Sequence, residues 1–149
     1  SEILEHPEIL DNDDFEMKFS NIPIRRHKTL QEVKSHIVKN ILIPIRETNS
    51  SLVGKECVLL IESVFLRGNY NGEEDLRELL IIKDVEELNE QNISDTSNKL
   101  KYSSILKFKG LEKKNIFLVI SKPSELNKYE MFVGITRAIL NLEIIIVEQ

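Results

Sequence analysis

Two short stretches in the last third of the sequence hold residue types that can bind a phosphorylated ligand. The first is KFKGLE, in which Lys109, Gly110 and Glu112 stand between two apolar runs. Gly110 would let the backbone turn tightly or approach a ligand closely. Glu112 has a carboxylate that can accept a hydrogen bond from a hydroxyl group, for example that of a ribose. A purely structural turn would explain the same residues.

The second stretch is FVGITRAIL, which places Arg137 within an otherwise apolar segment. Arginine is rarely buried without a partner, and its planar set of donors can bind a carboxylate or a phosphate through two hydrogen bonds. Two alternatives are open: a pair with a carboxylate at the edge of the core, or a side chain extended along a helix surface. Arg137 becomes a candidate for phosphate binding only together with the first stretch.

The elements that must position these residues alternate between strands and helices. A loosely alternating pattern predicts a strand at residues 14–24, and short, mostly apolar runs predict strands at residues 57–62, 102–106, 115–121 and 142–148. The capping-box pattern from Thr29 to Glu32, followed by apolar residues three and four apart, predicts a helix that Pro44 should kink or end near Ile43. Alternation of buried strands with helices predicts an α/β fold, with a mostly parallel sheet and helices on both faces.

Two further helices and a loop are predicted in the second half of the chain. Acidic residues followed by leucines at helical spacing predict a helix over residues 73–83, and the polar residues 89–101 predict an exposed loop or a weak hairpin. A helix over residues 123–140, capped by Ser124, would contain Arg137. Its apolar face is expected to comprise Leu126, Tyr129, Val133, Thr136 and Leu140. Ligands of open parallel sheets bind at the carboxyl ends of the strands, so we expect Lys109, Gly110 and Glu112 at that edge.

Composition limits the classes of protein to consider. With 149 residues, 41% hydrophobic and 30% charged, the sequence suits one domain over residues 1–149, in which residues 1–28 form an acidic lead-in and a strand. No apolar run approaches the roughly 20 residues that span a bilayer, and no secretory signal is visible, so a cytoplasmic location without membrane contact is the default expectation. The single cysteine, Cys57, and the dispersed histidines predict no metal site.

The net charge of −5 argues against a free-standing nucleic-acid-binding protein, but the charge is unevenly distributed. Residues 101–128 carry seven lysines against two glutamates and so have a net charge of +5, which leaves −10 for the rest of the chain. A local basic stripe can meet phosphates, although a solvated lysine-rich face is the simpler explanation.

Taken together, the two stretches give a family resemblance. SSILKFKGLEKKNIFLV followed by YEMFVGITRAILNLEIII resembles the paired C-terminal motifs of superfamily 1 helicases of the UvrD/Rep/PcrA type, over roughly residues 103–147. In that family a Lys-Gly-Leu-Glu motif leads into a strand, and a Thr-Arg-Ala motif follows on a helix before a final strand. The resemblance implies a three-layer RecA-like fold of the P-loop NTPase type and the C-terminal, second motor domain of a DNA helicase.

The resemblance also implies roles for individual residues. Glu112 would lie near the nucleotide sugar and Gly110 in the same turn, and Arg137 would be the catalytic arginine that reaches the γ-phosphate of ATP held between two RecA-like domains. Ser104, Lys107 and Lys109 would contact the nucleic-acid strand, which in this family is single-stranded DNA, with RNA as the alternative. The sequence departs from the family at Leu106, where a histidine is usual, and leucine cannot make that polar contact.

The sequence lacks the other half of such a site. No phosphate-binding G-x-x-x-x-G-K-[ST] loop and no acidic Mg²⁺ site occur, and the only Gly-Lys pair, Gly54-Lys55, is followed by glutamate. We therefore expect ATP and Mg²⁺ to be bound only with an N-terminal RecA-like domain of the same parent chain, and this chain alone to be inactive. The alternative is a non-catalytic α/β interaction module, in which Arg137 pairs internally. No Ser-His-Asp or paired-acid pattern supports a small hydrolase.

Overall fold

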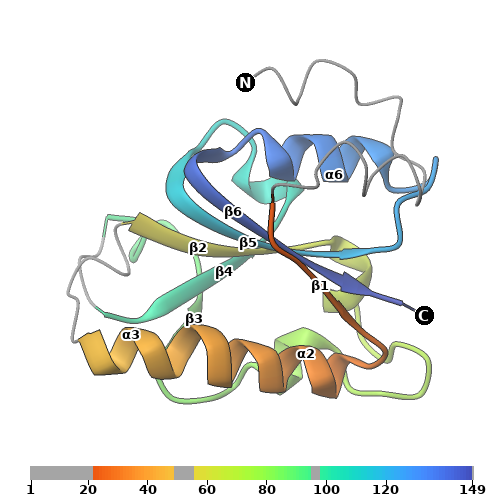
Figure 1. Ribbon diagram of the computed structural model, residues 1–149, viewed down its shortest axis with the longest axis horizontal. Helices are drawn as coiled ribbons and strands as arrows, with labels where there is room; N and C mark the ends of the chain where they lie inside the picture. Colours follow the sequence, from red (N-terminus) through yellow and green to blue (C-terminus); the bar gives the residue numbers. More distant parts are fainter. Residues whose placement is uncertain (1–21, 49–55, 95–97, 149) are drawn as a thin grey trace.

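One parallel sheet organises the molecule. The computed structural model describes residues 22–48, 56–94 and 98–148, and its six strands run in the order β1-β6-β5-β2-β4-β3, with every neighbouring pair parallel (Figure 1). The strands are β1 (Ile24–His27), β2 (Cys57–Ile61), β3 (Val85–Glu87), β4 (Leu100–Ser104), β5 (Lys113–Ser121) and β6 (Ala138–Val147). The predicted α/β class with a parallel sheet is confirmed.

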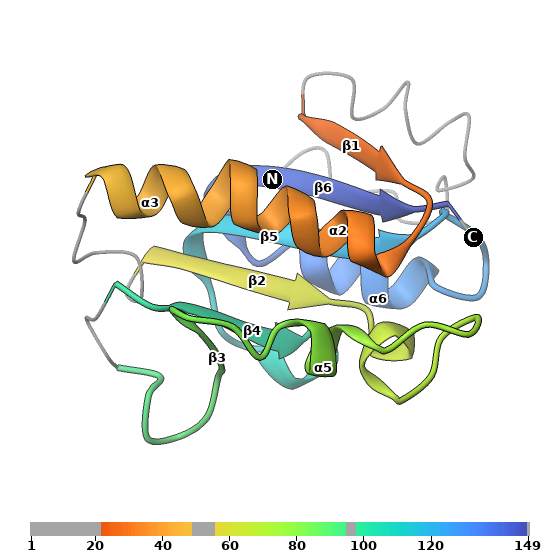
Figure 2. The ribbon, with the colours of Figure 1, turned by 90° about the horizontal axis from the view of Figure 1, so that it is seen from below.

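Helices cover both faces of the sheet, as predicted. On one face a long helix consists of α2 (Leu30–Ile37), the π-helical segment η2 (Val38–Leu42) and α3 (Ile43–Thr48), with the short α5 (Leu76–Leu79) beside it (Figures 1 and 2). On the other face lie α6 (Lys128–Ile135) and the 3₁₀ turn η4 (Leu106–Phe108), while a second 3₁₀ turn, η3 (Ser63–Leu66), follows β2. Because successive residues of β2 point to opposite faces, Leu59 and Ile61 enter one core and Val58 and Leu60 the other.

The capping pattern at Thr29 behaves as predicted. The Thr29 hydroxyl accepts a hydrogen bond of 3.1 Å from the backbone N–H of Glu32, and the Glu32 carboxylate accepts one from the N–H of Lys28. The Glu73 carboxylate, from a distant loop, accepts hydrogen bonds from the N–H groups of Leu30 and Gln31. The first-turn donors of α2 therefore have partners within the protein, which removes the usual cost of a helix start.

Pro44 does not end the helix as sharply as its missing N–H suggests. The five residues before Ile43 form the π-helical segment η2, and the helix then continues as α3 through the proline. A wider π turn inside an α-helix marks a locally disturbed hydrogen-bond ladder. The predicted kink is thus replaced by a change of helix type.

The helix near the carboxyl end is shorter than predicted, which corrects two expectations. It begins at Lys128 with Asn127, not Ser124, at its cap, because the Asn127 amide holds the preceding turn through the N–H of Ser124 and the carbonyls of Ser121 and Lys122. It ends at Ile135, so Arg137 lies in the turn after the helix rather than inside it.

Most of the predicted apolar face of this helix is also wrong, although Val133 is buried as predicted. Leu126 is 99% exposed and Tyr129 55% exposed, whereas Met131, Gly134 and Ile135 face the core. Gly134 allows close packing: a Cβ atom there would meet Leu118 Cδ1 at 2.6 Å. The close approach of α6 to β5 fixes which residues are buried, and helical spacing alone does not reveal it.

Several predicted boundaries move. Of the predicted loop 89–101, Leu100 and Lys101 belong to the buried strand β4, and the predicted strand 102–106 begins two residues earlier and ends at Ser104. The predicted helix 73–83 is only the four residues of α5. The predicted strand 14–24 meets β1 only at Ile24, and residues 14–21 lie outside the described residues. Among described residues, no helix is long and apolar enough to cross a membrane.

Candidate functional site

The amino ends of β5 and β6 bring the two sequence motifs together. Lys113 pairs with Ala138 across these neighbouring strands, and the N–H of Lys113 donates a 3.2 Å hydrogen bond to the carbonyl of Arg137. Glu112 comes immediately before Lys113, so Glu112 and Arg137 each stand one residue before a paired strand position. The backbone therefore places Glu112 and Arg137 on one edge of the sheet, the edge formed by the amino ends of the strands.

This edge is not the one that the sequence suggested. Glu112 precedes β5 and Arg137 precedes β6, so both lie at the amino ends of their strands and not at the carboxyl ends. The expectation treated KGLE as the end of β4, but η4 and the residues after it carry the chain back across the sheet face before β5 begins. Because β5 is parallel to β2, which is parallel to β4, this return crossing is unavoidable.

Arg137 is half-buried and is held at the end of α6 without a carboxylate. Its Nε donates to the carbonyl of Val133 at 3.2 Å and to the Thr136 hydroxyl at 3.1 Å, and its Nη2 donates to the same hydroxyl at 2.9 Å. The Thr136 hydroxyl in turn donates to the Val133 carbonyl. Among described residues Nη1 has no hydrogen-bond partner and the guanidinium forms no ion pair. The side chain is thus oriented by the helix end, with its charge not neutralised.

Glu112 is exposed, and the turn before it has a demanding backbone. Gly110 has a φ of +92°, a conformation that residues with a Cβ seldom adopt, and a Cβ there would meet no atom within 4 Å. The glycine is therefore required by the turn and not by close packing. Glu112 makes no ion pair with any residue that the structure describes, so its carboxylate is available to a ligand.

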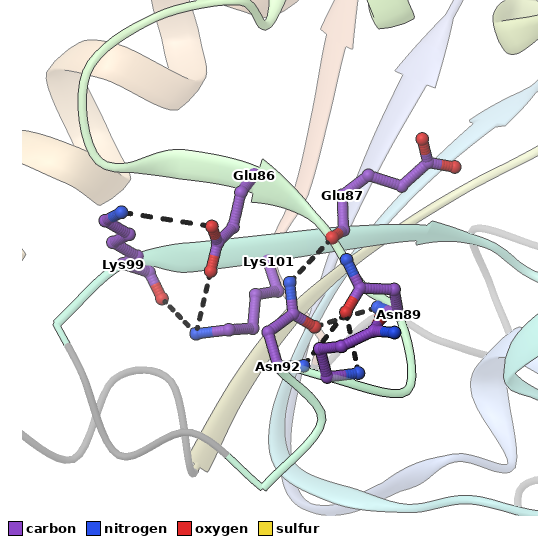
Figure 3. Close-up of polar contacts among 7 residues, drawn as sticks. Glu86, Glu87, Asn89, Asn92, Lys99 and Lys101 are labelled. Carbon is purple, nitrogen blue, oxygen red and sulfur yellow. Dashed lines mark hydrogen bonds and ion pairs between the residues drawn. The ribbon is translucent and has the colours of Figure 1, made fainter.

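Two lysines lie near this edge of the sheet. Lys113 is half-buried, and burial lowers its pKa, an effect that nearby Lys101 reinforces and Cys57 opposes. Lys101 is 1% exposed and lies 3.7 Å from the Glu86 carboxylate, with its ammonium donating to the carbonyl of Lys99 (Figure 3). The carboxylate of Glu86 provides the compensation that a buried ammonium requires.

The predicted nucleic-acid residues lie away from this edge. Ser104 ends β4, and Lys107 in η4 is exposed; Lys109 donates a 2.6 Å hydrogen bond from its ammonium to the hydroxyl of Tyr129 on α6. Lys107 lines a hollow of about 530 Å³ between η4 and the turn after β3, together with Leu88, Asn89, Glu90, Ile93, Ser103 and Leu111. Residues 105–112 thus join this surface to the edge that holds Glu112 and Arg137.

The turn that walls this hollow is fixed by two asparagines. The side-chain Oδ1 of Asn89 accepts from the N–H groups of Gln91 and Asn92, and the side-chain Oδ1 of Asn92 accepts from the N–H of Asn89 (Figure 3). The Asn92 amide also donates to the carbonyl of Glu87 at 2.8 Å. Asparagines readily form such local bonds in turns, so this wall of the hollow has a defined shape.

A buried carboxylate at the opposite edge escaped the sequence analysis. Glu62, 7% exposed, accepts hydrogen bonds from the N–H and the hydroxyl of Ser121 at 2.9 and 2.8 Å and from the Asn127 amide at 3.3 Å. It connects the ends of β2 and β5 to the cap of α6. A glutamate directly after an apolar strand was the signal, but its partners lie about sixty residues away in sequence, as the Glu62–Ser121 separation of 59 shows.

Two histidines form a second polar cluster that was not predicted. The rings of His27 and His36 lie 5.0 Å apart, and the Nε2 of His36 lies 2.9 Å from the Glu143 carboxylate on β6. The Nε2 of His27 is buried and has no hydrogen-bond partner among described residues. Burial lowers the pKa of His27, as does His36, while Glu32 opposes the shift.

Within the described ranges, no group of three or more His, Cys, Asp or Glu residues is arranged to hold a metal ion. Cys57 is half-buried, and burial raises the pKa of its thiol. The structure gives this cysteine no reactive environment, since reactive thiols have a lowered pKa.

Comparisons with known proteins give a structural match only. No protein-family model matches the chain, and no curated protein matches its sequence. Among solved structures, the chain is similar to the C-terminal domain of a possible DNA helicase from Lactobacillus plantarum WCFS1, with a TM-score of 0.63 and 10% sequence identity. The match covers 99% of this chain and 84% of that chain. The fold is RecA-like. At this identity the match shows the RecA-like fold alone, and the predicted roles of individual residues stay predictions.

Proposed function

We propose that this RecA-like domain is the second motor domain of an ATP-dependent DNA helicase or translocase of the UvrD/Rep/PcrA type. The observation that carries the proposal is the meeting of the KGLE turn and Arg137 at the amino ends of β5 and β6, where the Lys113 N–H binds the Arg137 carbonyl. Two motifs separated in sequence, and recognised independently of the fold, meet at one edge. The likeness to the C-terminal domain of a possible DNA helicase supports this proposal.

The groups at this edge suit a nucleoside triphosphate. Arg137 is oriented by Thr136 and Val133 but carries a charge with no carboxylate partner among described residues, which is what a phosphate-binding arginine requires. Glu112 is exposed and can accept a hydrogen bond from a sugar hydroxyl. ATP with Mg²⁺ would lie between this domain and a facing N-terminal RecA-like domain that supplies the phosphate-binding loop. When bound, ATP supplies the phosphoryl group that is transferred. Arg137 would stabilise the negative charge on that group only when the two domains close.

The residues at the amino-terminal end of segment 105–112 would form the surface that binds the nucleic-acid strand. Ser104, Lys107 and Lys109 would contact a single strand of DNA, with the lysines meeting phosphates. Leu106, 43% exposed, stands where the family has a histidine. Because leucine has no polar side-chain group, we assign no nucleic-acid contact to Leu106. Movement of the segment by strand binding would be transmitted along a few residues to Glu112.

The rival explanation is a non-catalytic interaction module in which Arg137 serves the fold. That explanation requires an internal carboxylate partner for the guanidinium, and the hydrogen bonds to Thr136 and Val133 do not provide one. We therefore favour the motor domain.

The test uses the natural gene product that carries this domain. We expect single-stranded DNA to stimulate its ATP hydrolysis, and Arg137→Ala to lower kcat about a thousandfold or more, with Arg137→Lys restoring only part of the activity. Arg25→Ala, at an exposed position on the edge strand β1, is the matched control and should leave hydrolysis unchanged. Equal hydrolysis by wild type and Arg137→Ala would refute the proposal and favour the interaction module.

A further inference from the structure

The lysines of residues 101–128 fall into two groups when their partners are considered. Lys101 lies near Glu86, Lys114 near Glu56 and Lys128 near Glu125, each within 4 Å, and Lys113 is half-buried in the sheet. The exposed remainder, which has no carboxylate partner within the described ranges, is Lys107, Lys109 and Lys122. The positive charge that stays available is therefore concentrated around η4 and the approach to α6, on one side of the sheet.

An exposed aromatic ring lies within this group. Tyr129, in the first turn of α6, is 55% exposed, and its hydroxyl accepts a 2.6 Å hydrogen bond from Lys109 Nζ. The same Nζ is 5.3 Å from the ring centroid, about the hydrogen-bond length plus the distance from the hydroxyl oxygen to the ring centre. The ammonium therefore lies near the plane of the ring, beyond its hydroxyl, and does not cover a ring face. Lys109 limits the movement of the ring and leaves its faces open.

We propose that Tyr129, Lys109 and Lys107 form a binding contact for a single-stranded nucleic acid, in which one base stacks on the Tyr129 ring and the two ammonium groups meet neighbouring phosphates. Stacking on an exposed aromatic ring next to cations is the general way in which proteins bind single strands without reading sequence. This inference rests on the proposed function for the kind of partner, and it adds Tyr129, a residue that the sequence placed in the core.

The arrangement of the surrounding elements favours a single-stranded nucleic acid, and not a protein, as the binding partner. Lys107 and Lys109 lie on η4 and directly after it, and α6, which carries Tyr129, packs against η4, so the three side chains come from adjoining elements. The exposed leucines of this part of the sequence, Leu106, Leu111 and Leu126, alternate along the chain with exposed lysines. A protein interface has an apolar centre from which charged residues are depleted, whereas the exposed ring here adjoins the Lys109 ammonium.

The stacking part of the proposal is tested by measuring fluorescence anisotropy of a short labelled oligo-thymidylate with this chain at low salt. Tyr129→Ala should weaken binding by about fivefold to a hundredfold, since stacking is lost. Tyr129→Phe keeps the ring and should bind nearly as wild type does. Leu140→Ala removes an apolar side chain that is 71% exposed on β6, and controls for nonspecific adhesion. An oligo-uridylate measured in parallel distinguishes RNA from DNA as the strand.

The charge part is tested by the salt dependence of the same binding. Lys107→Met should lower the slope of log K against log salt concentration by about 0.7, the value for one phosphate contact to a single strand. Lys39→Met, at an exposed position of η2 on the opposite face, should leave the slope unchanged. Circular dichroism checks that each variant is folded.

Two results would overturn the inference: no binding of either oligonucleotide at low salt, or equal binding by wild type and Tyr129→Ala. Neither result decides the motor assignment, which depends on ATP hydrolysis and on Arg137 at the other end of the 105–112 segment. Conversely, strand binding that depends on Tyr129, in a gene product whose ATP hydrolysis does not depend on Arg137, would keep this inference and reject the motor.

Discussion

Arg137 and Glu112 carry charges that no ionic partner neutralises among the described residues. Arg46 has Asp84, Arg77 has Glu87 and Lys114 has Glu56 as ionic partners, whereas neither Arg137 nor Glu112 forms an ion pair among described residues. Arg137 is nevertheless oriented, by the Thr136 hydroxyl and the Val133 carbonyl. A charge that is oriented but not neutralised is a feature of preorganised binding sites, because orientation is paid for during folding and not during the reaction.

The protonation of His27 should make the stability of the folded protein depend on pH. Burial and the neighbouring His36 lower its pKa below the ordinary value of 6.5, and Glu32 offsets only part of this. Between the lowered value and 6.5 the unfolded chain binds a proton that the folded chain does not, so stability rises with pH. We therefore expect this contribution to stability to be present above pH 6.5 and to be lost as the pH falls through the lowered pKa.

The measurement is urea unfolding on either side of pH 6.5, for wild type and His27→Gln. The variant has no titrating ring at this position, so its free energy of unfolding should change less across the interval. Glu143, which lies 2.9 Å from His36, is left intact in both proteins. If both proteins lose the same stability on acidification, His27 is not the source of the pH dependence.

At the scale of elements, the sheet edge opposite Arg137 depends on one carboxylate. Glu62 accepts three hydrogen bonds, two from Ser121 and one from Asn127, and thereby joins β2, β5 and the cap of α6. Glu62→Ala would remove the acceptor of the Ser121 N–H and hydroxyl, whereas the Asn127 amide keeps its bonds to the carbonyls of Ser121 and Lys122. The loss should lower the free energy of unfolding by about 2 to 4 kcal/mol.

The prediction is measured by urea unfolding with two further variants. Glu62→Gln retains one acceptor oxygen and should fall between wild type and Glu62→Ala. Glu74→Ala, at an exposed position of the loop before α5, should change stability by no more than about 0.5 kcal/mol. Equal effects of Glu62→Ala and Glu74→Ala would show that the three hydrogen bonds contribute little.

Elements were predictable where a local signal determines them. The Thr29 cap and the buried strand at residues 57–61 depend on local pattern, and both are found. The start of α6 was missed because Asn127 binds carbonyls of the turn before it, and the burial of Leu100 and Lys101 was missed because β4 gains its place from β2 and β3. Contacts between segments distant in sequence override local propensity at these points.

At the scale of the whole molecule, the parallel sheet with helices on both faces could be predicted, because apolar strands alternating with helices have few other ways to bury both faces. The edge that holds Glu112 and Arg137 could not, because it depends on where the chain recrosses the sheet between β4 and β5. Residues 105–112 make this crossing with only the 3₁₀ turn η4, and their apolar residues show no helical spacing from which the crossing could be predicted. Whether Glu112 and Arg137 bind ATP stays a prediction.

A last prediction concerns what this chain does in isolation. Its ATP-binding groups would be an arginine and a glutamate at one rim, and the sequence has no phosphate-binding loop and no acidic Mg²⁺ site. An arginine that acts on a phosphoryl group from a facing domain contributes only after the phosphates and the metal are held by the other domain. The purified chain should therefore hydrolyse ATP at the background rate, with or without single-stranded DNA. Arg137→Ala should give that same rate, because the residue has nothing to act on. Phosphate release measured continuously with both proteins decides the matter: turnover well above background by wild type would mean that the chain holds a complete site, and the two-domain arrangement would have to be abandoned.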